Sequence, residues 1–264
     1  MNTWLRQGGR TLAALLVALL ALPLLAMVWS ASLADVIAAW RSPALLQALL
    51  VSLKTTSISL ALIIAAGTPL AWWLSRKHNS NLVKAITGLL RLPVLLPPAV
   101  MGFALLLAFG SQGVLGGWFA RAGIHVAFTT TAVVLAQTIV AVPFFVAAAQ
   151  LGFAAIDDDA LLVARTLGAS QRRVFTHVLV PLALPALMSG AAMAWARALG
   201  EFGATLFFAG NLPGRTQTMP LAIYAALESD VGLAKALALV LVGLALLGVA
   251  VGRVLAWALQ RGAR

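Results

Sequence analysis

Two side chains of opposite charge lie four residues apart in a very apolar part of this sequence. Arg197 and Glu201 occur in AWARALGEFGATLFF, residues 194–208, which is otherwise suited to lipid. That spacing places both on one helical face, where they can pair. A charge inside a membrane is costly unless it is paired or faces the bundle interior or water. We favour a structural ion pair that locks helix packing. A pair beside a polar path is the alternative, and one pair can satisfy both readings.

Small residues and prolines accompany this pair. Gly200 and Gly203 lack side chains, which permits close contact with another helix or a local bend. Pro97 and Pro98 interrupt another apolar run. Broken helices are tolerated where neighbours or a water-lined cavity satisfy the backbone. A path-lining role and simple kinked packing therefore both stay open for the two prolines.

A second polar group interrupts the apolar pattern in LLVARTLGASQRRVFTHVLVP, residues 161–181. Asp157, Asp158 and Asp159 precede it, as acidic residues do at a helix start. Gly168 is expected to end this helix. Its expected apolar face consists of Leu161, Leu162, Ala164, Leu167 and Ala169, and its polar residues include Arg165, Thr166 and Ser170. The pattern predicts a short surface helix, which either transmits motion to a partner or rests on lipid.

The composition indicates a membrane protein. The 264 residues are 62% hydrophobic and only 9% charged, whereas soluble domains carry about 25% charged residues. The formal charge is +11, but the basic residues sit mostly at the ends of apolar runs. Orientation signals and lipid head-group contacts belong there, so nucleic-acid binding is not expected.

No feature of the sequence indicates an enzyme. The chain has no cysteine and three scattered histidines, so we expect no disulfide and no metal site. There is no nucleophile–base pair and no GxxxxGK[ST] phosphate loop. The sequence therefore offers no catalytic residue and no ATPase site of its own.

Six apolar runs reach the roughly 20 residues that a membrane-spanning helix needs. The predicted fold is an all-α polytopic helix bundle in a single domain, residues 1–264. The first run is expected to be an uncleaved span, since its apolar core is longer than that of a signal peptide. The predicted spans cover residues 11–31, 52–75, 85–110, 128–152, 178–208 and 233–258, with a polar loop at 153–177.

The distribution of Lys and Arg predicts the orientation. One side carries eleven: Arg6, Arg10, Arg76, Lys77, Lys84, Arg165, Arg172, Arg173, Arg253, Arg261 and Arg264. The other side carries five: Arg41, Lys54, Arg121, Arg215 and Lys235. Arg91 and Arg197 fall within runs. Both termini and the 153–177 loop are therefore expected in the cytoplasm of a bacterial or archaeal cell, with the spans in its inner membrane.

The stretch ARTLGASQRRVFTHVLVP resembles the cytoplasmic coupling loop of ABC importer permease subunits. The family pattern is Glu-Ala-Ala, three residues, Gly, nine residues, Ile, one residue, Leu-Pro. Ala164 matches the second Ala, Gly168 the Gly, and Val180-Pro181 the closing pair. Leu162 stands where the family has Glu, and Val163 stands where it has the first Ala. The resemblance implies that residues 161–170 dock on a separate ATPase subunit.

Two further stretches resemble the permeases of molybdate importers. They are LPVLLPPAVMGFALLLAFG at 92–110 and ARALGEFGATLFFAGNLPGRTQTMPLAIY at 196–224. The resemblance implies two permease copies, two ATPase subunits that hold ATP and Mg²⁺, and a soluble molybdate-binding protein outside. The chain itself is then expected to hold no cofactor. Arg197, Gly200, Glu201, Gly203 and Thr205, with the two prolines, become candidates for the path or its gate.

Other functions stay open at the level of sequence. Sulfate and tungstate permeases share most of this pattern. A stand-alone secondary transporter would need intramembrane carboxylates for ion coupling, and here only Glu201 qualifies. A purely structural membrane anchor would not need the polar cytoplasmic helix. We expect a weakly polar, slightly positive path, with hydroxyls such as that of Thr205 and helix N-termini as donors.

Overall fold

The computed structural model describes residues 3–77 and 80–262, and every regular element in these ranges is a helix. The side chains of residues 3–8, 158, 160, 253 and 259–262 are not described. The helices are α1 Thr3–Ser30, α2 Leu33–Arg41, α3 Pro43–Arg76, α4 Asn81–Leu95, α5 Pro98–Phe109, α6 Gly116–Arg121, α7 Thr130–Ala154, α8 Asp158–Thr166, α9 Gln171–Val174, the π-helical turn η1 Phe175–Leu179, α10 Val180–Leu199, α11 Gly203–Ala209, α12 Met219–Leu227 and α13 Val231–Gly262.

Within the described residues, five helical segments are long and apolar enough to cross a membrane. The third predicted span, residues 85–110, is not one straight helix. It forms α4 and α5, which meet at 117°. Leu96 and Pro97 lie at the break, and Pro98 starts α5. A proline supplies no N–H to the preceding turn and disfavours a helical residue before it, so Pro97 and Pro98 together account for the break.

The fifth predicted span also ends earlier than expected. Helical structure runs from Gln171 to Leu199 and stops at Gly200. A separate short helix, α11, follows from Gly203. The predicted range 178–208 therefore contains a break at residues 200–202, which the two glycines permit because they lack a side chain.

The core lies where α3, α7 and α10 pack together. Phe145 on α7 and Leu74 on α3 are fully buried there. Small residues bring the helices close, as is typical of membrane proteins. A Cβ added at Gly67 of α3 would lie 2.8 Å from the ring of Phe145, and one at Gly152 of α7 would lie 2.3 Å from Ala186 Cβ. The close approach of these helices therefore depends on glycine.

Hydroxyl groups join three of the helices. Ser52, Thr55, Thr56 and Ser59 occupy one face of α3 and are all fully buried. The Ser52 hydroxyl accepts a hydrogen bond from the backbone N–H of Met219 at 2.7 Å, and Thr138 of α7 donates to Ser59 at 3.0 Å. Such bonds between helices contribute about 0.6–2 kcal/mol each in a membrane. They fix the start of α12 and the register of α7 against α3.

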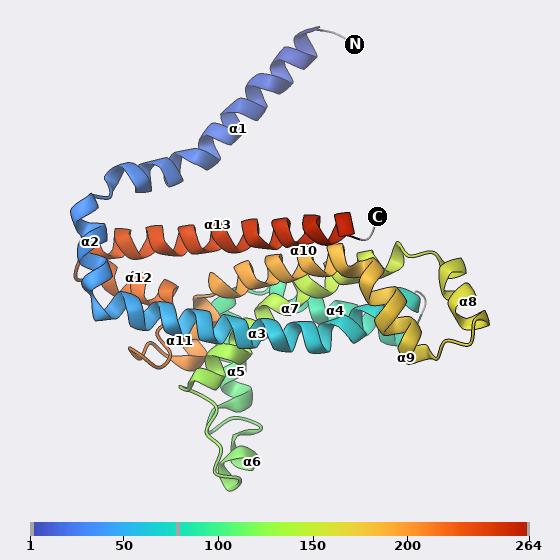
Figure 1. The fold of residues 1–264 in the computed structure, drawn as a ribbon. Helices are drawn as coiled ribbons and strands as arrows, with labels where there is room; N and C mark the ends of the chain where they lie inside the picture. Colours follow the sequence, from blue (N-terminus) through green and yellow to red (C-terminus); the bar gives the residue numbers. More distant parts are fainter. Residues whose placement is uncertain (1–2, 78–79, 263–264) are drawn as a thin grey trace.

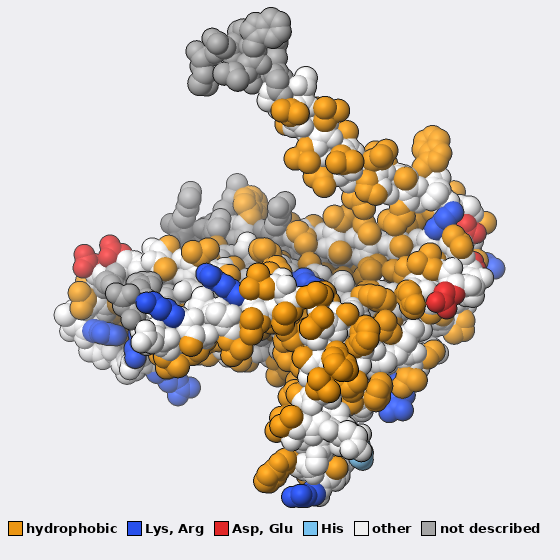
Figure 2. All heavy atoms as spheres, turned by 180° about the vertical axis from the view of Figure 1, so that it is seen from behind, with side chains coloured by type: hydrophobic (Ala, Val, Ile, Leu, Met, Phe, Trp, Pro, Cys, Tyr) orange, Lys and Arg blue, Asp and Glu red, His pale blue; other side chains and the backbone are white. Residues whose placement is uncertain are grey.

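Figure 1 shows α3, α10 and α13 side by side, with α8 and α9 at one end of the molecule and α2 at the other. The C-terminal end of α13 lies at the same end as α8 and α9, while α1 projects away from the body. Figure 2 shows charged side chains at both ends and an apolar band between them. Arg264 lies outside the described residues, as do the side chains of Arg6, Arg253 and Arg261.

Candidate functional site

The predicted pair of Arg197 and Glu201 forms an ion pair. Arg197 Nη1 lies 2.7 Å from Glu201 Oε2, and the glutamate side chain is only 1% exposed while that of the arginine is 27% exposed. The other carboxylate oxygen, Oε1, accepts a hydrogen bond from the backbone N–H of Ala204 at 2.8 Å. That N–H belongs to the first turn of α11, where a negative group is favoured. Glu201 therefore connects the end of α10 to the start of α11.

The broken third span meets the break after α10. A Cβ at Gly203 would lie 3.0 Å from both Pro98 Cβ and the backbone nitrogen of Ala99, so α11 begins in contact with the start of α5. A hollow of about 370 Å³ lies at this junction. It is lined by Pro97, Pro98, Ala99, Arg197, Gly200, Glu201, Phe202, Gly203 and Phe207. Two chain breaks far apart in sequence thus face one space.

Six predicted path residues, Pro97, Pro98, Arg197, Gly200, Glu201 and Gly203, therefore line one hollow. Thr205 does not line it. Its side chain is fully buried within this chain, and its hydroxyl makes no hydrogen bond among the described residues. The reason is its place in α11, whose buried residues pack against α5 and α7. As an anion donor, Thr205 stays a prediction that this geometry does not favour.

Sequence reasoning missed the aromatic side chains of the hollow. Phe202 and Phe207 line it beside the ion pair. The Phe202 ring packs at a tilt of 54° against the ring of Tyr224 of α12, with ring centroids 5.4 Å apart. Nothing in the spacing of these residues distinguishes them from core aromatics. Their position next to the Gly200 and Gly203 break was the available signal.

The predicted surface helix between two spans is α8. Asp157 caps its start by accepting a hydrogen bond from the N–H of Asp159 at 3.1 Å. Its end is closed by backbone bonds from Gly168 and Ala169 to the last turn. Gly168 has φ +81°, a left-handed conformation that glycine adopts without steric cost. The helix boundaries predicted from the aspartates and from Gly168 are therefore confirmed.

The expected single apolar face of this segment was wrong, because the structure divides it in two. Leu161, Ala164 and Ala169 pack against the core. Leu162 and Leu167 point outward, 55% and 82% exposed, as does Val163 at 59%. Successive residues of a helix point about 100° apart, and Leu167 follows the last turn of α8. One face therefore anchors the helix and another is available to a partner.

The polar residues of this segment lie mainly on the outside. Arg165, Thr166 and Ser170 are exposed. The Ser170 hydroxyl accepts a bond from the N–H of Arg173 at 3.4 Å and so caps α9, a role that sequence did not assign to it. Figure 2 shows Lys and Arg side chains gathered at this end of the molecule. The exposed surface of α8 and α9 is thus apolar at its centre, with both basic and acidic side chains around it.

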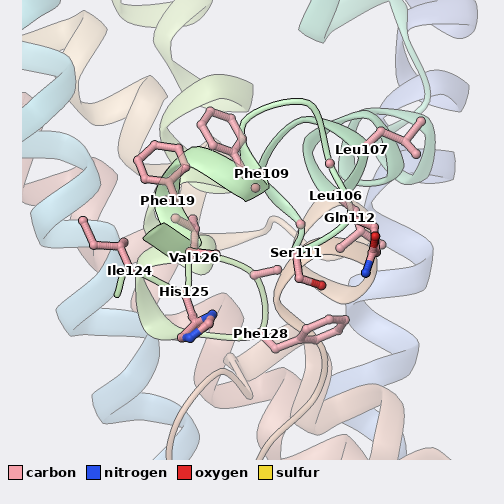
Figure 3. Close-up of a pocket in the computed structure, with 15 residues that line it drawn as sticks. Leu106, Leu107, Phe109, Ser111, Gln112, Phe119, Ile124, His125, Val126 and Phe128 are labelled. Atoms are coloured by element: carbon pink, nitrogen blue, oxygen red, sulfur yellow. The ribbon is translucent and has the colours of Figure 1, made fainter. Parts of the chain in front are cut away.

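Another hollow lies under α6, at the lobe that follows α5. Figure 3 shows Phe109 and Phe119 on one side of it and Gln112 on the other. It contains none of the residues that sequence predicted for the path or for coupling. Among the residues that the structure describes, no group of three or more His, Cys, Asp or Glu side chains could hold a metal ion.

Comparison with known proteins identifies the family. The family described as "Binding-protein-dependent transport system inner membrane component" matches residues 67–264. This chain belongs to that family. The residues that match the family therefore include α8, α10 and the whole junction between α5 and α11.

Curated relatives and solved structures agree with this assignment. The chain is 45% identical over 206 residues to "Molybdenum transport system permease protein ModB" of Mycobacterium tuberculosis, which covers 78% of each chain. It is 38% identical over 205 residues to the protein of the same name from Escherichia coli K12, covering 76% of this chain and 87% of that one. The resemblance read from the sequence motifs is confirmed.

The fold is confirmed as well. A chain of a bacterial alginate ABC transporter, crystallised with its pentasaccharide-bound periplasmic protein, superposes with a TM-score of 0.74. The alignment covers 94% of this chain and 92% of that one at 15% identity. The permease has the multi-pass helical fold of ABC importer membrane subunits, and its family places it in the inner membrane.

Proposed function

We propose that this chain is the membrane subunit of an ATP-driven importer that carries molybdate into the cell by alternating access. The observation that carries the importer part is α8: a short helix held between two spans by Leu161 and Ala164, with Leu162, Val163 and Leu167 exposed. A membrane protein without a partner gains no stability from exposing three large apolar side chains at its surface. The substrate follows from the relatives named for molybdenum transport.

The partners follow from the same proposal. Residues 161–170 dock on an ABC ATPase subunit, which binds and hydrolyses ATP with Mg²⁺. A second copy of this chain completes the path at the junction of α5, α10 and α11. A soluble molybdate-binding protein delivers the anion at the outer face. Both termini and α8 then lie in the cytoplasm.

The Arg197–Glu201 pair acts as the structural support of the path. It neutralises two intramembrane charges and holds α11 against α10 while the prolines and glycines keep the backbone irregular beside the hollow. Irregular backbone at membrane depth is tolerated where protein buries it or a water-filled cavity adjoins it. Because the pair is internally neutral, the site does not trap a dianion.

Reconstitution tests the proposal. The permease is co-expressed with a candidate ABC ATPase subunit, placed in proteoliposomes and given a molybdate-loaded binding protein. Molybdate-dependent ATP hydrolysis together with accumulation of molybdenum inside the liposomes is the expected result. Molybdenum entry without an ATPase or ATP would instead indicate a stand-alone transporter. Equal transport of sulfate would move the substrate to the wider oxyanion group.

A further inference from the structure

Arg91 belongs neither to the residues proposed for the path nor to those proposed for ATPase docking. It lies on α4, ten residues after the cytoplasmic start of that helix at Asn81, and inside a predicted span. Its side chain is exposed in the single chain, and it makes no ion pair within the described residues. Arg197, by contrast, is neutralised by Glu201. An unpaired arginine within a span costs about 2.5–3.5 kcal/mol or more at the centre of a lipid bilayer.

Arg91 faces a hollow instead of an isolated patch of surface. The hollow has a volume of about 610 Å³ and lies between α4, α7 and α10. Two more polar side chains line it, Thr87 of α4 and Gln150 of α7, one turn from the end of that helix. None of the three makes a hydrogen bond with another described residue. Polar groups at this depth need water or a polar ligand.

This hollow is linked to the site at the chain breaks through lining residues that neighbouring hollows share. It shares Phe144 and Met193 with a neighbouring hollow of about 610 Å³. That neighbour is also lined by Arg197, which in turn lines the hollow beside Pro97 and Glu201. The three spaces therefore adjoin one another from the ion pair toward the inner ends of α4 and α7. Arg91 lines the last hollow of this series.

We propose that Arg91, with Thr87 and Gln150, forms a transient binding station for the tetrahedral oxyanion in the cytoplasmic half of the path. The inference rests on the proposed function and adds a ligand site to it. A guanidinium group, a hydroxyl and an amide supply donors for the four oxygens of such an anion. Arg91 is the one charged side chain that lines the hollow, and it attracts the dianion. Apart from Thr87 and Gln150 the lining is apolar, which keeps the attraction weak enough for release.

Cysteine labelling tests the location directly, because the chain contains no cysteine. Arg91→Cys is made in the complete importer, and inside-out vesicles are treated with a membrane-impermeant thiol reagent. The station predicts labelling that molybdate slows. Leu89→Cys is the matched control, since Leu89 is 65% exposed on the same helix but does not line the hollow; it should stay unlabelled. An unreactive Arg91→Cys, or labelling that molybdate leaves unchanged, would overturn the proposal.

Transport measurements test the charge. Arg91→Gln should lower molybdate uptake about tenfold, the effect of losing one charge-assisted interaction, while the ATPase still co-purifies. Arg91→Lys should restore most of the uptake. Lys84→Gln removes an exposed cation from the same helix outside the hollow and should transport normally. Wild-type uptake by the Arg91→Gln variant would contradict the anion site at Arg91 but leave the importer proposal intact. Failure of the unaltered chain to import molybdate would contradict the proposed function itself.

Discussion

Glu201 performs two tasks with its two carboxylate oxygens. Oε2 pairs with Arg197, and Oε1 accepts the hydrogen bond from Ala204 at the start of α11. The side chain is almost completely buried, so the ion pair offsets the cost of its charge and the hydrogen bond satisfies the Ala204 N–H. A residue with both roles holds α10 and α11 in one arrangement.

Substitutions of Glu201 separate these tasks. Glu201→Gln keeps an oxygen for the Ala204 N–H but leaves Arg197 without its counter-charge, and should cost about 3–5 kcal/mol of stability. Glu201→Ala also leaves the N–H unsatisfied and should cost about 1–3 kcal/mol more. Thermal unfolding in detergent, followed by size-exclusion chromatography, measures both. Equal destabilisation by the two variants would show that the Ala204 bond contributes nothing.

The sequence was sufficient to predict the ion pair, because a spacing of four residues sets the distance on any helix. It was not sufficient to place Gly203 against Pro98 and Ala99. That contact joins residues about 100 positions apart, and no local pattern encodes which helix approaches a glycine. Thr205 illustrates the same limit, since its burial depends on how α5 and α7 cover α11.

At the scale of elements, α5 and α11 pack backbone against backbone. A Cβ at Gly102 of α5 would lie 2.6 Å from the carbonyl oxygen of Ala204 and 2.7 Å from its Cα. Real Cβ atoms do not approach so closely, and a backbone neighbour cannot rotate away. The contact therefore sets the distance between the broken third span and the start of α11, beside the proposed path.

Gly102→Ala should separate these two helices. The expected cost is about 1–3 kcal/mol, the usual effect of overpacking, together with slower transport. Gly88→Ala is the matched control within α4, where an added Cβ meets nothing within 4 Å; its effect should stay within about 1 kcal/mol. Thermal unfolding and uptake measure both variants. A Gly102→Ala protein that is as stable and active as the control would contradict the close contact.

The two faces of α8 lead to a prediction about assembly. Leu167→Glu places a charge on the outward face, at a side chain that is 82% exposed. The permease should keep its thermal stability, because nothing in its own core is lost, but ATPase co-purification should fall severalfold. Leu82→Glu, at an exposed leucine near the start of α4, is the control. Full ATPase recovery with Leu167→Glu would remove this face from the docking surface.

Element boundaries were predictable where the chain marks them. The aspartates and Gly168 bracket α8, and the prolines mark the end of α4. The angle of 117° between α4 and α5 was not predictable, because a proline permits a bend without fixing its direction. The division of the α8 side chains into anchoring and outward groups also depended on the position of the core, which periodicity over nine residues does not reveal.

At the scale of the whole molecule, α1 contributes little to its own chain. No residue from Gly9 to Ser30 is buried within the chain, and α1 projects away from the body (Figure 1). We expect α1 to take part in the contact that we propose between two copies, because it touches the body mainly along α13 and through the Lys235–Ser30 hydrogen bond. A chain without residues 1–30 should keep the thermal stability of the body but form fewer dimers in detergent, as measured by light scattering. Undiminished dimer formation would contradict this role.

Cellular molybdenum content measures directly whether the chain imports molybdate. Cells with and without this chain are grown in nanomolar molybdate, with and without excess sulfate, and analysed for the element. Cells that contain the chain should hold more molybdenum, with no loss when sulfate is added. Equal molybdenum with and without the chain, or a gain that sulfate abolishes, would contradict it.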